Sequence, residues 1–505
     1  MTTVGMSVQD SLWLTTDRPN NLMVVDGAMV LRGVPTRAAV DEVMTAAVER
    51  FPVFARKPVR SGPGWAWQDD PDFDVSRHIE MVDFDEPMSM TELQDFLAAQ
   101  RSQELPKDRP LWRMMVLSPV ELADGTQGSA VVSRFHHAIA DGVRLTQVLL
   151  SLCESDGASV SAVVSRKSAS KSADEAADSE GVTGVALHAA SGATSLVGHT
   201  VAGLVTGTAH AARHPMTALT ETPVRAASAG LHGLGAGIDL VRHPDRMLDA
   251  LEELGVNNNR GTNDFSSVTK LALAGVEDTV WTGEPGIAKA VAWSAPVPLD
   301  SIKEVGRAAG ATVNDVLLAA VAGGLRKYLA ERDTQVDEVI WMVPVNLKPF
   351  EDNLPPDLGN YFALVFMPMP LDTEDPHERL EQMHHRMARI KNSDEAVLTF
   401  GLQRLVSLSP TQVATFLTNF FANKAVGVLT NVPGPASPMT FAGVPVDQLV
   451  GFAPCSGNQP MTTTIFSYNG GVTIGFATDA TLVPDPAELA ANVVADLAAM
   501  GVRLD

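Results

Sequence analysis

Two stretches of the chain alternate strand-like and helix-like segments, and a long segment without this alternation separates them. In the first stretch, alternating apolar residues over 26–32 predict a strand, and apolar positions of 37–51 share one helical face. The pattern predicts an α/β (α+β) fold with two mixed domains in tandem and a cleft between them. In the second stretch we predict helices at 299–309, 313–332 and 376–391, strands at 339–345 and 361–369, and a hairpin over 462–477 that turns at Asn469-Gly470.

The intervening segment sets the predicted domain boundaries. Residues 155–181 are rich in Ser, Ala, Asp and Lys and contain no aromatic residue, which is typical of a flexible linker. We predict a helical connector over 182–270, which leaves 1–154 and 271–505 as the two mixed domains. A length of 505 residues suits two or three domains at roughly 150 residues each.

The composition excludes several classes of protein. The 37 Lys and Arg residues face 60 Asp and Glu, so the net charge is −23 and a basic face for nucleic acid is not expected. Only Cys153 and Cys455 are present, so the chain can build neither a disulfide framework nor a multi-cysteine metal site. We predict no metal. The first ten residues lack a basic stretch followed by an apolar core, so we expect a cytoplasmic protein without a secretory signal.

One part of the connector has no charged residue at all. Residues 181–212 contain Ser, Thr, Gly and His throughout, so they lack the ~20 apolar residues of a membrane span. They form an amphipathic helical pattern, which could either pack on the core or lie in a lipid interface. We favour packing, because interfacial helices usually carry Lys or Arg on the polar face. Its three histidines, separated by 11 residues, would lie ~16 Å apart and could not share one metal.

A pair of histidines stands where a predicted strand, 129–135, runs into a predicted helix. Adjacent strand side chains point to opposite faces, so one of His136 and His137 can face a channel while the other packs. A neutral imidazole can take a proton from an alcohol near pH 7, typically for a rate gain of about 10²–10⁴. Asp141 could orient the ring or hold the loop, and Gly142 allows a tight turn. Alternatively, Asp141 is an ordinary helix N-cap beside two incidental histidines.

These residues match a known motif. His136-His137-x-x-x-Asp141-Gly142 resembles the HHxxxDG motif of the CoA-dependent acyltransferase superfamily. In two of the motif blocks named next, the sequence departs slightly from the family pattern: Lys348 stands where Arg is common, and Thr430 stands where Ser is common. Further segments resemble, in the same order, the motif blocks of the bacterial wax ester synthase/diacylglycerol acyltransferase family: Arg109-Pro110-Leu111-Trp112, Asn314-Asp315, residues 343–349, Leu358-Gly359-Asn360, and Thr430-Asn431 with the Val-Pro-Gly-Pro that follows.

The resemblance implies two chloramphenicol-acetyltransferase-like domains, joined by the helical connector, with an active-site tunnel between them. It implies an O-acyltransferase that moves a long acyl group from acyl-CoA to diacylglycerol or a fatty alcohol, with acyl-CoA as co-substrate and no other cofactor. His137 would be the general base without an acyl-enzyme, while His136 and Asp141 would support the loop. Since both substrates are apolar, we expect peripheral contact with a membrane or lipid-droplet surface.

The supporting blocks also have structural interpretations. Thr312-x-x-Asp315 matches a capping box, so Asn314 could serve the helix start or the site. The segment that begins at Asn431 either forms an ordinary turn or lines the channel opposite His137. Asn314 and Asn431 are both candidates to stabilise an oxyanion. We expect Trp112 to be a core residue and His384-His385 to be a solvated helix face. Two alternative functions stay open: a condensation-type acyltransferase with a carrier-bound donor, and an inactive lipid-droplet binding protein.

Overall fold

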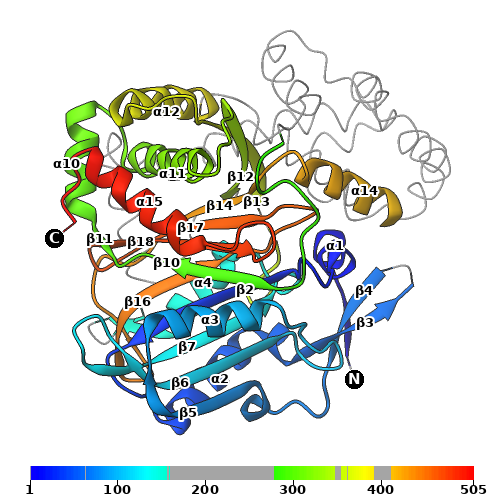
Figure 1. Ribbon diagram of the computed structural model, residues 1–505. Helices are drawn as coiled ribbons and strands as arrows, with labels where there is room; N and C mark the ends of the chain where they lie inside the picture. The colour runs from blue at the N-terminus through cyan, green and yellow to red at the C-terminus, as the bar shows by residue number, and fades with distance from the viewer. Residues whose placement is uncertain are drawn as a thin grey trace, which may run out of the picture.

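Figure 1 shows the computed structural model of the chain. The structure describes residues 2–62, 64–155, 158–159, 278–346, 354–360, 362–391 and 411–504. The predicted connector and its uncharged helix lie outside the described residues, as does most of the predicted linker. The boundaries after residue 154 and before residue 271 therefore stay predictions.

The first half of the described chain alternates strands and helices. Its elements are β1 (Thr3–Gly5), α1 (Val8–Thr16), β2 (Val24–Leu31), α2 (Arg37–Arg50), β3 (Arg56–Ser61), β4 (Gly64–Asp69), β5 (Ile79–Met88), α3 (Met90–Arg101), β6 (Trp112–Glu121), β7 (Gln127–His136), α4 (Gly142–Ser151), β8 (Cys153–Ser155) and β9 (Ala158–Ser159), with short 3-10 helices at Pro52–Ala55 and Val75–His78.

The second half repeats the alternation. Its elements are β10 (Lys289–Trp293), β11 (Val297–Pro298), α10 (Leu299–Ala309), α11 (Val313–Ala330), β12 (Glu338–Asn346), β13 (Phe362–Pro370), α12 (Pro376–Lys391), α14 (Thr411–Ala422), β14 (Gly427–Pro433), β15 (Thr440–Phe441), β16 (Val444–Phe452), β17 (Met461–Tyr468), β18 (Gly471–Asp479) and α15 (Pro486–Ala499). The predicted helices 299–309 and 376–391 are confirmed to the residue.

Two large sheets organise the described residues, beside a small sheet in the order β1-β4-β3. The larger has the order β5-β6-β7-β2-β16-β15-β8-β9, and the other runs β10-β18-β17-β14-β12-β13, with β11 also paired to β18. Strands β15 and β16 come from the second half of the sequence, yet β16 pairs antiparallel with β2, placing Val450 opposite Ala28. The two halves thus share a sheet, which the linear pattern did not predict.

Helices α11, α12 and α15 lie together over the second sheet (Figure 1). Helix α11 is apolar around most of its circumference because these neighbours bury it, and Gly324 lets Val493 of α15 approach so closely that a Cβ would lie 2.5 Å from it. Among the described residues no single helix is long and apolar enough to cross a membrane. Only α10 and α11 together meet that test, as a pair bent by 97°.

The predicted hairpin is confirmed by β17 and β18. Their register places Tyr468 opposite Gly471, which leaves a two-residue turn. Asn469 and Gly470 have φ values of +46° and +82°, the left-handed conformation that a type I′ turn requires at both positions. Asn and Gly tolerate this region better than other residues, so the turn follows directly from the sequence.

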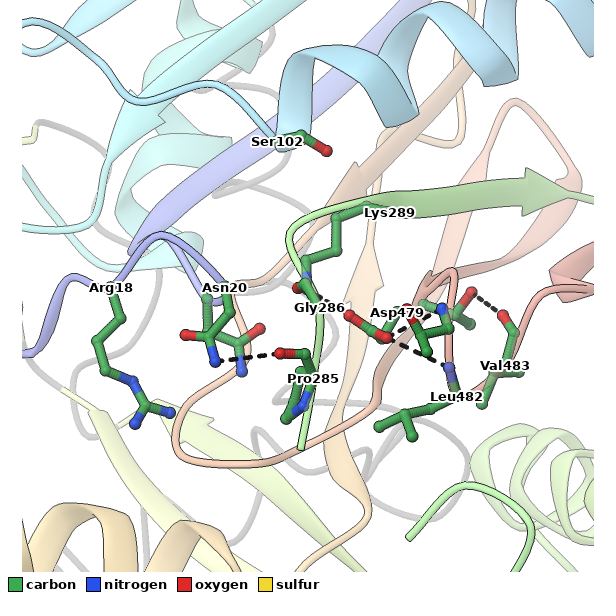
Figure 2. A network of polar contacts seen from close by, with 12 residues as sticks. Arg18, Asn20, Ser102, Pro285, Gly286, Lys289, Asp479, Leu482 and Val483 are labelled. Atoms are coloured by element: carbon green, nitrogen blue, oxygen red, sulfur yellow. Dashed lines mark hydrogen bonds and ion pairs between the residues drawn. The ribbon is translucent and has the colours of Figure 1, made fainter. Parts of the chain in front are cut away.

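The segment between α1 and β2 is hydrogen-bonded to the second half of the chain. Figure 2 shows Asn20 donating through Nδ2 to the carbonyl oxygen of Pro285, at 3.2 Å. In the same network, the Lys289 ammonium lies 2.9 Å from both a carboxylate oxygen of Asp479 and the carbonyl oxygen of Gly286. The chain that leads into β2 is therefore held against the second half.

Candidate active site

His137 lies at the boundary between the two halves of the fold. It directly follows β7, and its main-chain N–H donates to the carbonyl oxygen of Met23, at 2.7 Å. Its imidazole packs against the indole of Trp13 from α1, with ring centroids 4.6 Å apart, and against the ring of Phe362 from β13, at 5.6 Å. The residue is only 7% exposed. The two halves together therefore enclose this side chain.

Burial determines the charge of His137. Desolvation, assisted by the neighbouring His136, lowers the pKa of the His137 imidazole to about 4, against the opposing effects of its own carbonyl group and Asn360. The ring is consequently neutral at pH 7 and can accept a proton. Its Nδ1 atom is fully buried and has no hydrogen-bond partner among the described residues.

His136 points to the other side and is held by polar groups. Its Nδ1 accepts a hydrogen bond from the Ala138 main-chain N–H, at 3.1 Å, so the ring proton belongs on Nε2, which lies 3.6 Å from a carboxylate oxygen of Asp17. Burial alone raises the pKa of the Asp17 carboxyl, but His136, a main-chain amide and the Lys107 ammonium lower it to about 2. The Ala138 N–H therefore fixes the tautomer of His136, and the protonated Nε2 faces the Asp17 carboxylate.

Asp141 caps helix α4. Its carboxylate accepts a hydrogen bond from the Arg144 main-chain N–H, at 2.8 Å, in the N-cap geometry, and Gly142 is the first helical residue. The Asp141 main-chain N–H donates to the carbonyl oxygen of Gly359, at 3.3 Å. The aspartate of the motif thus sets the helix start and touches the second half of the chain.

Asn360, next to Gly359, connects this loop to α1. Its Nδ2 group donates to the main-chain oxygen of His137, at 3.0 Å, and to a carboxyl oxygen of Asp10, at 2.7 Å. Burial raises the pKa of the Asp10 carboxyl. Our sequence analysis missed Asp10. The only local signal is Ser7-x-x-Asp10, and because the Ser7 hydroxyl accepts from the Asp10 N–H, that signal indicates no more than a helix start.

Asn314 and Asn431 are brought together from separate elements. Asn431 on β14 donates through Nδ2 to Oδ1 of Asn314 in the first turn of α11, at 2.7 Å. Asn314 is buried, and its own Nδ2 has no hydrogen-bond partner in the described part of the chain. A buried N–H pair without an acceptor is available to a ligand atom.

The strand register relates these asparagines to the end of the sheet that meets His137. Residue 341 of β12 pairs with Gly427 of β14 in parallel register, and Asn346 of β12 lies opposite Phe362 of β13. The pairing between β12 and β14 ends at Met342 and Val428, but because the two strands are parallel, Asn431 near the carboxyl end of β14 lies toward the same end of the sheet as Phe362. The aromatic contact of His137 and the paired asparagines therefore share one sheet end.

Asp315 belongs to a reciprocal capping box with Thr312, as the sequence predicted. The same carboxylate lies 2.8 Å from Nδ1 of His384 on α12. The prediction of a solvated pair is therefore right for His385, whose side chain is 74% exposed, and wrong for His384, which is 39% exposed and bound to Asp315. The contact joins two helices, so the helical pattern of α12 alone could not show it.

The segment from Pro110 to Trp112 is hydrogen-bonded to the end of β7, where the His136-His137 pair begins. The carbonyl oxygen of Leu111 accepts from the His136 main-chain N–H, at 3.0 Å. Trp112 is a core residue: its indole N–H donates to a main-chain carbonyl, at 2.8 Å, and its ring stacks on His78 with centroids 4.7 Å apart. This block supports the loop from the core.

Two cavities lined by described residues lie away from His137. One is lined by Asp26, Arg101 and Lys289, and the other surrounds His78. The tunnel implied by the resemblance therefore stays a prediction. No group of three or more His, Cys, Asp or Glu residues in the described ranges could hold a metal ion.

Comparisons with known proteins agree with one another. Residues 6–236 match the wax ester synthase/diacylglycerol acyltransferase catalytic domain, and residues 358–501 match the C-terminal domain of the same family. A probable diacylglycerol O-acyltransferase of Mycobacterium tuberculosis is 24% identical, covering 86% of this chain and 82% of that protein.

Two solved structures share the fold. The wax ester synthase/diacylglycerol acyltransferase from Marinobacter aquaeolei VT8 has a TM-score of 0.59 at 17% identity, covering 98% of both chains. The first condensation domain of the calcium-dependent antibiotic synthetase has a TM-score of 0.51 at 14% identity, covering 99% of this chain and 95% of that one. The chain has their two-domain fold, and by its two matched domains it belongs to the wax ester synthase/diacylglycerol acyltransferase family.

Proposed function

We propose that this chain is an O-acyltransferase that moves a long acyl group from acyl-CoA to the hydroxyl of diacylglycerol or a fatty alcohol. The observation that carries the proposal is His137: a neutral imidazole within the family's motif, buried between the two halves and packed by apolar rings. The products would be triacylglycerol or wax esters, and acyl-CoA would be a co-substrate rather than a resident cofactor.

In this mechanism Nε2 of His137 takes the proton of the acceptor hydroxyl. The acceptor oxygen attacks the thioester carbonyl carbon, and the carbonyl electron pair moves onto oxygen. When the tetrahedral intermediate collapses, the C–S bond breaks and His137 returns the proton to the CoA sulfur. The imidazole is neutral at the start of the cycle, as its lowered pKa requires, and it is neutral again once the proton has passed to sulfur. No acyl-enzyme forms.

The negative charge on the intermediate needs a hydrogen-bond donor. We assign this role to the paired amides of Asn314 and Asn431, because the buried Nδ2 group of Asn314 has no other acceptor among the described residues. Removing one such donor typically costs about 3–4 kcal/mol of transition-state stabilisation. Asp315 and Asn360 would hold the surrounding helix start and loop.

Peripheral contact with a membrane or lipid-droplet surface is part of the proposal, because both substrates partition into lipid. Flotation of the full chain with vesicles of phosphatidylcholine and dioleoylglycerol tests this contact. Co-flotation of the protein is expected. Protein that stays at the bottom of the gradient with and without dioleoylglycerol would contradict it.

The activity is tested by the release of CoA thiol from palmitoyl-CoA with hexadecanol, with dioleoylglycerol, and with no acceptor. Wild type and the exposed-site control His385→Ala should both release thiol only when an acceptor is present. His137→Ala should remain folded and lose about 10²-fold or more of the turnover. If wild type releases no thiol with either acceptor, the first alternative is an acyltransferase with a carrier-bound donor, and the second is an inactive lipid-binding protein. Near-normal turnover in folded His137→Ala would remove His137 from the mechanism.

A further inference from the structure

We propose that Asp10 is a positioning residue for acyl transfer, acting on His137 through the side-chain amide of Asn360. This inference rests on the proposed function. Helix α1 holds His137 in two ways. Asp10 binds the Asn360 amide, which in turn binds the His137 main-chain oxygen, and Trp13 contacts the imidazole directly. Residues 10 and 13 lie on one face of a helix, so a single element holds both contacts.

The two acceptors determine how the Asn360 amide is oriented. Its Nδ2 atom carries two hydrogens, and one is directed to a carboxyl oxygen of Asp10 and the other to the main-chain oxygen of His137. If the amide rotated by 180°, its Oδ1 atom would face those two oxygens, and oxygen lone pairs would oppose each other. Without the Asp10 acceptor, the Asn360 amide loses one of the two hydrogen bonds that favour the observed orientation.

The amide orientation matters because it fixes the peptide group that follows His137. The main-chain N–H of His137 donates to Met23, and its main-chain oxygen accepts from Asn360, so the two peptide groups that flank the His137 Cα are both held. Loss of the second bond frees the backbone that carries the imidazole. A catalytic group must be held within a fraction of an ångström, so a small rotation of this peptide lowers the rate without blocking substrate binding.

A second consequence concerns the imidazole itself. The Oδ1 atom of Asn360 and the Nδ1 atom of His137 are both buried, and neither has a hydrogen-bond partner among the described residues. The observed amide orientation directs a carbonyl oxygen, rather than an N–H group, away from Asp10. Burial has the largest influence on the pKa of the His137 imidazole and lowers it, and the Asn360 side chain, which Asp10 orients, acts in the opposite direction.

The test compares near-isosteric variants of Asp10 in the full chain. Asp10→Leu keeps the branched shape of the side chain, with methyl groups in place of the oxygens, but cannot accept a hydrogen bond, whereas Asp10→Asn keeps one carbonyl oxygen as an acceptor. With palmitoyl-CoA and the better acceptor, Asp10→Leu should lower kcat about tenfold with KM for palmitoyl-CoA within twofold of wild type. Asp10→Asn should recover most of kcat. Asp479→Asn, another buried carboxylate that is paired with Lys289 and far along the chain, is the matched control and should keep wild-type kcat.

A double variant separates positioning from general stability. In the Asn360→Ala background, adding Asp10→Leu should change kcat by less than twofold, because the group through which Asp10 acts is already missing. If Asp10→Leu does not fold, Asp10→Ala replaces it in both comparisons. The proposal is overturned if a folded variant without the acceptor keeps kcat within twofold of wild type, or if the loss is undiminished in the Asn360→Ala background. An inactive wild type would instead refute the proposed function.

Discussion

The burial of His137 predicts an acid-sensitive fold, and replacing this residue should remove its share of the sensitivity. Burial, with a smaller contribution from His136, lowers the pKa of His137 to about 4 in the folded chain. In the unfolded chain a histidine titrates near 6.5. As the pH falls below about 6.5, the unfolded state takes up the proton first. The folded state then loses stability until its own pKa is passed.

The size of this effect follows from the two pKa values. At pH 4.5 the unfolded histidine is almost fully protonated and the folded one is mostly neutral, so His137 should remove about 2.5 kcal/mol of unfolding free energy relative to pH 7. His137→Gln has no titrating group at this position. Its unfolding free energy should therefore fall by about 2.5 kcal/mol less than that of wild type over the same pH interval.

Urea titration of both proteins at pH 7 and pH 4.5, followed by far-ultraviolet circular dichroism, measures this difference. The slope of the unfolding free energy with urea should be the same for both proteins, so that the comparison reports stability alone. Equal losses in wild type and His137→Gln would refute the argument, because they would mean that the folded chain protonates His137 as readily as the unfolded chain does.

Two further predictions concern the core. Arg134→Ala leaves the buried Asp26 carboxylate with Arg101 as its remaining ion-pair partner, so unfolding free energy should fall by about 3 kcal/mol in urea titration; a loss below about 1 kcal/mol would contradict this. Gly427→Ala would bring a Cβ to 1.9 Å from the main-chain oxygen of Met461 and force β14 and β17 apart. No soluble folded protein is therefore expected by circular dichroism and size-exclusion chromatography. A variant that melts at the wild-type temperature would refute the reasoning.

The sequence by itself determined the features that depend on neighbouring residues. Helix α10 follows from its apolar periodicity, the β17–β18 turn from Asn469-Gly470, and the start of α11 from Thr312 and Asp315. The motif around His137 and the order of the family's blocks were also readable, and with them the two-domain fold. Each of these signals lies within a few residues along the chain, where dihedral preferences and side-chain spacing act directly.

Only the tertiary structure decided the partners of these features. Asp10 and Asn360 are 350 positions apart, and each has a sufficient local explanation, one in the first turn of α1 and the other in a loop. The same holds for β16 beside β2 and for His384 beside Asp315. Long-range hydrogen bonds leave no periodic trace in the sequence, because they depend on where whole elements pack. His137, the proposed base, could therefore be found by its motif, whereas the groups that hold it in position became visible only in the folded chain.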